Sequence, residues 1–209
     1  MAIVKNRNKK GMTLVEMLVS IGIFSIAMSG LTALFINVWR SNKYSMELGQ
    51  SVMVVSQGLG KMGNYIRGSR QSDNGSYPIV SASDNDLVIY SDYDKDNVTE
   101  RLHIYKSGNN VLMGVRDPSG TMPKTYASGD AETVTLASSI INNSSHPIFQ
   151  YFDENYPIDT TNNPIATPAS VSRIKLVRVY LQINIDPNNA PDNVEMESFI
   201  DIRNLNDRI

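Results

Sequence analysis

The chain begins with a long apolar run and continues with a periodic apolar stripe. Between Met12 and Trp39 the only charged residue is Glu16. Apolar or aromatic residues then recur at steps of three and four, the spacing of one face of an α-helix, at Tyr44, Leu48, Val52, Val55, Leu59, Met62 and Ile66. The first proline is Pro78, so this strong helix breaker is absent before it. The pattern predicts one helix over residues 12–68, with a membrane-spanning first half at about residues 12–39 and a stripe that packs on a C-terminal domain.

Residues 69–209 carry short β-type runs separated by turn residues, which predicts one β-rich head domain. Strands are expected at residues 77–81, 86–91, 98–105, 111–116, 133–136, 148–152, 174–185 and 194–202. The alternation from Val177 to Ile185 is typical of a half-buried strand. Ile174 and Leu176 have the other parity, which predicts a bulge near Leu176–Val177. Two long loops are expected at residues 117–132 and 153–170. The predicted fold class is α+β, a long helix packed on an antiparallel head.

The residues in front of the apolar run are basic and indicate how the helix enters a membrane. Four cations, Lys5, Arg7, Lys9 and Lys10, precede the span, which places the N-terminus in the cytoplasm and the head outside it. A secretory signal peptide with a small-residue cleavage site at residues 27–29 has the same order of charge and hydrophobicity. So does a plain membrane anchor. Neither interpretation explains Glu16, because a carboxylate inside an apolar span costs free energy and usually marks function.

A third interpretation depends on the sequence at the start of the run. Gly11-Met12-Thr13-Leu14-Val15-Glu16 resembles the processing site of type IV prepilins and pseudopilins, whose usual form is G-F-T-L-x-E. The basic leader, the glycine, the glutamate and the apolar run stand in the family's order. Met12 departs from the pattern, since phenylalanine is usual there, and this affects the expected efficiency of methylation.

The resemblance implies a processing step and an assembly role. A membrane peptidase is expected to cut after Gly11, remove the leader of residues 1–11 and methylate the amine of Met12. Thr13, Leu14 and Glu16 are then the assembly residues, and Glu16 pairs with the N-terminal amine of a neighbouring subunit. The implied partners are the prepilin peptidase, other pilins or pseudopilins through the helix, an inner-membrane assembly platform, and membrane lipid before assembly.

The head resembles the larger minor pilins and the J-type minor pseudopilin of type II secretion. This resemblance is carried by the long segment after the helix, the two late strands and the ending Ile202-Arg203-Asn204-Leu205. It implies a structural subunit of a type IV pilus-like filament that acts at the tip or starts assembly. A pseudopilin of type II secretion or of competence is an alternative. A singly anchored surface binding module, dependent on calcium, is a further one.

One acidic loop in the head has the composition of a calcium site. Asp92, Asp94, Asp96 and Glu100 stand at relative positions 1, 3, 5 and 9 of the loop, and calcium prefers such oxygen ligands. Position 12 is His103, where an EF-hand has a bidentate glutamate, and the flanking runs predict strands. The other interpretation is a polar hairpin turn whose aspartates cap local amides.

Composition argues against catalysis and against general nucleic-acid binding. The chain has no cysteine, two histidines, His103 and His146, and no recognisable nucleophile or phosphate-binding motif, so we expect no enzyme. Removal of the four leader cations leaves 15 basic and 21 acidic residues, a formal charge of −6. An acidic head lacks the basic footprint of nucleic-acid binding, and the candidates for a local basic face are Arg173, Lys175 and Arg178.

Overall fold

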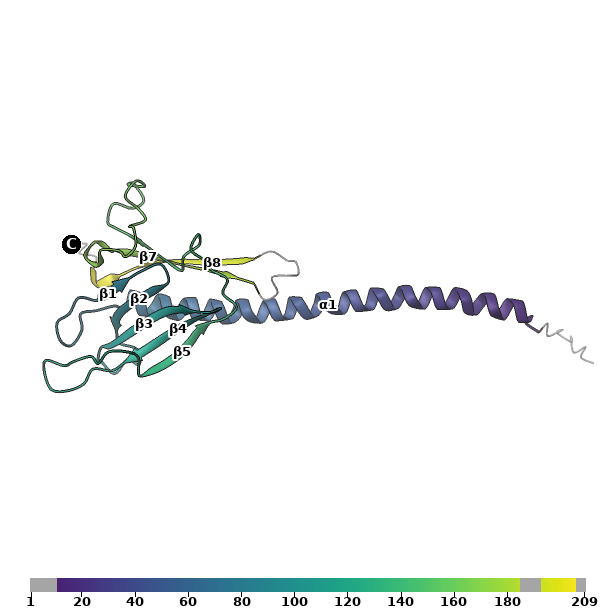
Figure 1. The fold of residues 1–209 in the computed structure, drawn as a ribbon, viewed down its shortest axis with the longest axis horizontal. Helices are drawn as coiled ribbons and strands as arrows, with labels where there is room; N and C mark the ends of the chain where they lie inside the picture. Colours follow the sequence, from purple (N-terminus) through teal and green to yellow (C-terminus); the bar gives the residue numbers. More distant parts are fainter. Residues whose placement is uncertain (1–10, 185–192, 206–209) are drawn as a thin grey trace, which may run out of the picture. The chain divides into compact units, whose positions relative to one another are not determined.

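The computed structural model describes residues 11–184 and 193–205 (Figure 1). Most of the leader, residues 1–10 with its four cations, and Ile185 at the end of a predicted strand lie outside the described residues. Helix α1 spans Leu14–Arg67, which confirms the long helix predicted from the apolar run and the periodic stripe. By its internal contacts the chain divides within this helix into one unit that ends at Glu47 and another that begins at Leu48.

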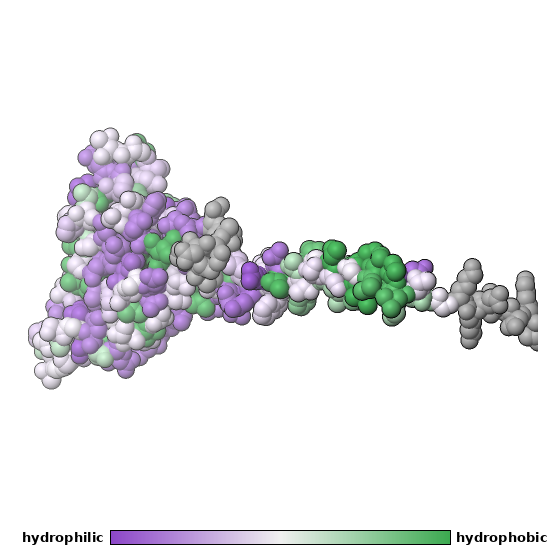
Figure 2. Space-filling model, turned by 45° about the vertical axis from the view of Figure 1, so that its right-hand side comes forward, coloured by the Kyte–Doolittle hydropathy of each residue, from purple (hydrophilic) through white to green (hydrophobic). Residues whose placement is uncertain are grey.

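The first unit is the apolar part of α1. Every side chain from Gly11 to Lys43 is exposed, and Figure 2 shows much of this helix as apolar surface. The helix contains one stretch that is long and apolar enough to cross a membrane, as judged by length and composition alone. A helix that is apolar on all sides requires a lipid or protein environment to cover it.

The second unit contains two antiparallel sheets that pack with the C-terminal part of α1. The first has the order β1-β2-β3-β4-β5 and the second β6-β7-β8. Their bounds are β1 Ile79–Ala82, β2 Asp86–Ser91, β3 Glu100–Ser107, β4 Asn110–Arg116, β5 Glu132–Ala137, β6 Phe149–Phe152, β7 Leu176–Ile183 and β8 Val194–Asp201. Each overlaps a predicted strand, so the α+β class is confirmed. Two 3-10 turns, η1 Val171–Arg173 and η2 Arg203–Leu205, flank the β7–β8 pair.

The predicted stripe of α1 is the helix's contribution to the core. Val55, Leu59, Met62 and Ile66 are buried in one cluster with residues of both sheets. Gly58 lies on the same side, and a Cβ there would come 2.0 Å from the carbonyl oxygen of Leu136 in β5. The backbone of α1 therefore lies so close to β5 that a residue with a side chain does not fit at position 58.

Strand β7 corrects two predictions. Its register is regular from Leu176 to Ile183 against β8, so the bulge predicted near Leu176–Val177 is wrong. The η1 turn instead precedes Ile174, which is buried before the strand begins, and this turn accounts for the change of parity. The strand is also buried continuously from Val179 to Ile183, not half-buried, because the side chains of Tyr180 and Gln182 on its second face are buried too.

Candidate functional site

The N-terminus of α1 contains a reciprocal hydrogen-bonded pair. The backbone nitrogen and Oγ1 of Thr13 each lie 2.9 Å from Oε2 of Glu16 and donate to it. The backbone nitrogen of Glu16 donates in return to Oγ1 of Thr13 at 3.3 Å. This is a capping box, which satisfies amide groups that have no partner inside the helix. The capping box was not among the sequence-based predictions, although the T-x-x-E spacing before an apolar run is its sequence signal.

The capping box gives the two oxygens of Glu16 different roles. Oε2 accepts both hydrogen bonds from Thr13, whereas Oε1 accepts none within the described part of the chain. The carboxylate is therefore held at the start of the helix, with its other oxygen available to a further donor such as a cation. Leu14 and Met12 are exposed beside it.

The segment around Glu16 is similar to a known family of proteins. Residues 6–32 match the family model described as the prokaryotic N-terminal methylation motif. The chain carries the N-terminal motif of type IV prepilins and pseudopilins. The family that carries this motif is structural rather than catalytic, and the motif implies processing by a prepilin peptidase and assembly with other pilins. Neither a curated protein nor a solved structure matches the chain.

The acidic loop joins β2 to β3 and brings three of the four predicted calcium ligands together. Ligand oxygens of Asp92, Asp94 and Glu100 all lie within 4.8 Å of one another. Asp96 is outside this group, and its Oδ1 accepts a hydrogen bond from the backbone of Val98 at 2.7 Å. Asn97 has a φ of 71°, the left-handed conformation that a tight loop of this kind requires.

Two features distinguish the acidic loop from a turn whose carboxylates are all solvated. Glu100 is 4% exposed, and burial, with the charges of Asp94 and Asp96, raises the pKa of its carboxyl. Among the described residues, Oδ1 of Asp92 is buried without a hydrogen-bond partner. The other oxygen of Asp92 lies 3.4 Å from Nη2 of Arg70, a residue that the sequence analysis did not single out. The loop thus holds a buried carboxyl group and an unsatisfied carboxylate oxygen on the same side.

His103, the residue at position 12 of the loop pattern, belongs to a different group of side chains. Its Nε2 lies 2.7 Å from Oδ2 of Asp86, and its Nδ1 lies 3.0 Å from Oδ2 of Asp130. Asp130 also contacts Arg101 at 3.3 Å. These contacts hold the end of the long β4–β5 loop on the outer face of the five-stranded sheet, so His103 is not a ligand of the acidic loop.

Gly114 makes this arrangement sterically feasible, and Gly114→Ala is expected to cost about 1–2 kcal/mol of unfolding free energy. A Cβ on Gly114 would lie 2.1 Å from Cγ of Asp130, which forces that side chain away from His103. Asp130→Ala removes the same contacts. The Cβ of residue 130 would still lie 2.6 Å from the added Cβ, so in a double-mutant cycle the two substitutions together should cost more than Asp130→Ala alone but less than the sum of the two single costs. Fully additive costs in urea unfolding would contradict this arrangement.

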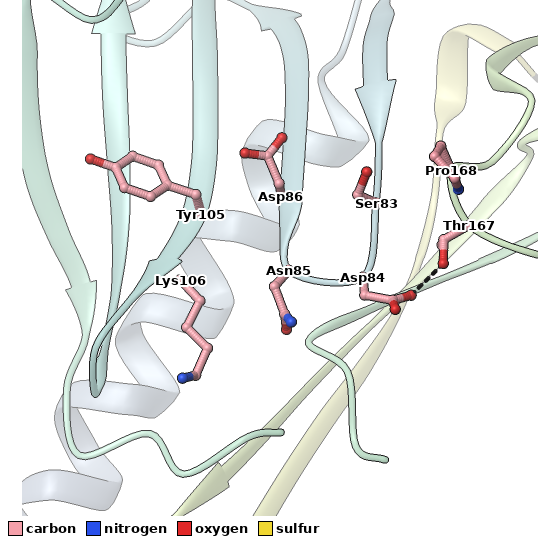
Figure 3. Close-up of a pocket in the computed structure, with 8 residues that line it drawn as sticks. All are labelled: Ser83, Asp84, Asn85, Asp86, Tyr105, Lys106, Thr167 and Pro168. Atoms are coloured by element: carbon pink, nitrogen blue, oxygen red, sulfur yellow. Dashed lines mark hydrogen bonds between the residues drawn. The ribbon is translucent and has the colours of Figure 1, made fainter. Parts of the chain in front are cut away.

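A polar groove of about 460 Å³ lies where the β1–β2 turn meets the loop before β7. Figure 3 shows Asp84 at its edge, with one carboxylate oxygen accepting a hydrogen bond from Oγ1 of Thr167 at 2.6 Å. The backbone oxygen of Asp84 accepts from Phe149, and Oδ1 of Asn85 accepts from Ile148. These groups join the two sheets, so the groove's polar atoms have a structural use.

The three cations proposed for a local basic face all have acceptors within the chain. Arg173 lies 2.7 Å from Asp153, Lys175 donates to the carbonyl oxygen of Leu205, and Arg178 lies 2.6 Å from Glu197. The positive charges of Arg173 and Arg178 are therefore compensated locally, and the ammonium group of Lys175 is occupied by a hydrogen bond. The arrangement offers no support for a phosphate-binding surface at these residues.

Proposed function

We propose that this pilin-like protein is a structural minor pilin or pseudopilin of a type IV pilus-like filament. The supporting observation is the apolar half of α1, which carries the methylation motif and has no cover from the chain's own described residues. Before assembly the membrane covers this helix, with the N-terminus in the cytoplasm and the head outside. In the filament, other subunits' helices replace lipid, and an inner-membrane platform carries out the exchange.

The capping box supports a specific assembly role for Glu16. One oxygen stabilises the subunit's own helix through Thr13, and the free Oε1 accepts the cleaved amine of a neighbouring subunit. Pairing of opposite charges offsets the cost of removing both from water. The head, with two sheets and long loops, is large enough to serve as a tip structure that starts assembly. A pseudopilin of type II secretion or competence would use the same parts.

Proteolytic processing is the first test of this proposal. The full chain would be expressed with and without a prepilin peptidase, and the intact mass of the membrane-extracted protein measured. We expect loss of residues 1–11 and gain of one methyl group only when the peptidase is present. A bulkier residue at the cleavage site, as in Gly11→Val, should block the change without altering membrane extraction. An uncut chain would leave only a membrane anchor, and a cut within residues 27–29 would indicate a secreted β-domain.

A second proposal is that Asp92, Asp94 and Glu100 bind calcium and fix the β2–β3 loop. The buried, unpartnered Oδ1 of Asp92 favours it, because a cation would satisfy that oxygen. Glu100 sets the pH dependence. The pKa of this carboxyl is raised in the folded protein. Without metal, its contribution to stability is therefore fully present below the pKa of the unfolded state and is lost as pH rises through the pKa of the folded state. Calcium requires the ionised carboxylate, so the metal's effect should weaken as pH falls through that raised pKa.

Thermal unfolding of the full chain tests the calcium proposal. At a free calcium concentration 100 times the Kd, stabilisation should be about 2.7 kcal/mol, a rise of roughly 5–10 °C in Tm. Asp94→Asn should abolish the rise, whereas Glu154→Gln, an exposed acid outside the loop, should preserve it. Equal Tm values in calcium and in a chelator would exclude this site.

A further inference from the structure

The outer face of the three-stranded sheet carries a row of aromatic side chains that the core does not require. Core residues of β7 point to the other face, as Val177 and Val179 do. On the outer face, Gln150 of β6, Arg178 of β7 and Phe199 of β8 stand opposite one another in register. We call this surface the aromatic face, and it comprises His146, Gln150, Phe152, Tyr156, Arg178, Tyr180, Glu195, Glu197 and Phe199.

The rings of the aromatic face contact one another in sequence. Phe152 lies 4.3 Å from Tyr156 and 6.0 Å from Phe199 between ring centroids. Tyr156 and Phe199 are 6.3 Å apart and nearly parallel, at 11°. The guanidinium of Arg178 continues the row, 5.8 Å from Phe199 and 5.0 Å from Tyr180. Phe152 and Tyr180 are buried and form the base, whereas Phe199 is 44% exposed, so the row presents ring surface to solvent.

The electrostatic character of the aromatic face excludes anionic ligands. Arg178 is the cation in the row, and both its Nε and Nη2 lie within hydrogen-bond distance of Oε2 of Glu197, at 2.8 and 2.6 Å. Its Nη1 donates to Oε1 of Gln150 at 2.6 Å. Glu195 adds a further carboxylate beside Tyr180. A phosphate or nucleic acid would meet no uncompensated positive charge here, so a ligand must be neutral or cationic.

Beside the row, a hollow of about 270 Å³ gathers polar groups. Three of its lining groups have no hydrogen-bond partner among the described residues, namely the ring nitrogens of His146, the amide nitrogen of Gln150 and the hydroxyl of Ser145. Donors and acceptors therefore surround a ring-lined floor. Polar groups that converge beside ring surface can fix the orientation of a bound ligand.

We propose that the aromatic face binds a neutral glycan chain with equatorial linkages, such as a β-1,4-linked hexose or N-acetylhexosamine oligomer. The apolar C–H faces of pyranose rings lie on the exposed ring of Phe199 and on the partly exposed ring of Tyr156. The hydroxyl groups of the glycan bind the free amide nitrogen of Gln150, the imidazole of His146 and the hydroxyl of Ser145 in the hollow. A flat, ribbon-like glycan fits the open face of a sheet better than a helical one. This inference is independent of filament assembly.

Isothermal titration calorimetry of the full chain tests this inference, in a detergent without a sugar headgroup. Cellohexaose and chitohexaose are the probes, and maltohexaose, whose axial linkages make it helical, is the counter-ligand. We expect at least one of the two ribbon-like oligomers to bind and maltohexaose not to bind. Phe199→Ala should weaken binding about tenfold, and Gln150→Ala should weaken it too. Tyr77→Ala removes a comparably exposed ring, 37% exposed, in front of β1 and should leave binding unchanged.

Absence of binding by both cellohexaose and chitohexaose would overturn the proposal, as would binding that Phe199→Ala leaves unchanged. A proline-rich decapeptide, another class that uses aromatic surfaces, is titrated in parallel. Binding of this peptide in place of the glycans would assign the face to peptide recognition. Urea unfolding of each variant separates a lost contact from a lost fold.

Discussion

Replacement of Gly58 by alanine is expected to destabilise the folded head by about 3 kcal/mol, near the upper end of the usual range for overpacking. The added Cβ would lie 2.0 Å from the carbonyl oxygen and 2.8 Å from the carbonyl carbon of Leu136. Both atoms belong to the backbone of β5, so no side-chain rotation relieves the clash. Helix α1 must move away from β5, and the packing of the adjacent Leu59 and Val55 in the core is lost with it.

Gly60 is the matched control for Gly58, since it lies two residues further along the same helix. A Cβ there would meet nothing within 4 Å, and Gly60→Ala should stabilise the helix by up to about 1 kcal/mol. The measurement is urea unfolding of the full chain, followed by a spectroscopic signal from the head. Equal effects of the two substitutions would show that α1 does not approach β5 as closely as described.

The helix and the strands were predictable because their signals are local. A run without proline, an apolar stripe at helical spacing and alternating strands each depend on neighbours a few residues apart. The bulge near Leu176–Val177 was predicted wrongly because the parity change has another local cause, the η1 turn. The close packing of Gly58 was not predictable, because in the sequence a helical glycine indicates only a locally less stable helix, and its partner, Leu136, is distant in the chain.

The candidate sites also divide into those with a local sequence signal and those that depend on distant parts of the chain. The methylation motif was predictable because its residues are contiguous, and its T-x-x-E spacing also contained the capping box. The clustering of acidic residues in the loop was predictable. The separate position of Asp96 was not, because it depends on which backbone amide donates a hydrogen bond to each carboxylate. The aromatic face was not predictable, because it depends on the pairing of β6, β7 and β8 and on a loop that places Tyr156 beside Phe199.

Substitution of Glu16 should separate its two proposed roles, helix capping and charge pairing between subunits. Glutamine at this position can still serve the capping box, yet it carries no charge. If assembly depends on an ion pair with a neighbour's amine, Glu16→Gln and Glu16→Ala should both reduce filament yield by about a hundredfold or more, because an unpaired charge remains buried. Thr13→Ala, which weakens the cap and keeps the charge, should reduce the yield far less.

The measurement is the fraction of processed subunit recovered in sheared filaments, with the membrane-bound fraction as the reference. Glu47→Gln is the matched control, because Glu47 lies on the same helix and its described ion pair is an exposed one with Lys43 at 3.6 Å. Near-normal yield for Glu16→Gln together with loss for Glu16→Ala and Thr13→Ala would assign Glu16 to capping alone. Oε1 of Glu16 would then have no partner in the neighbouring subunit, and apolar packing without a specific charge pair would hold the helix in the filament.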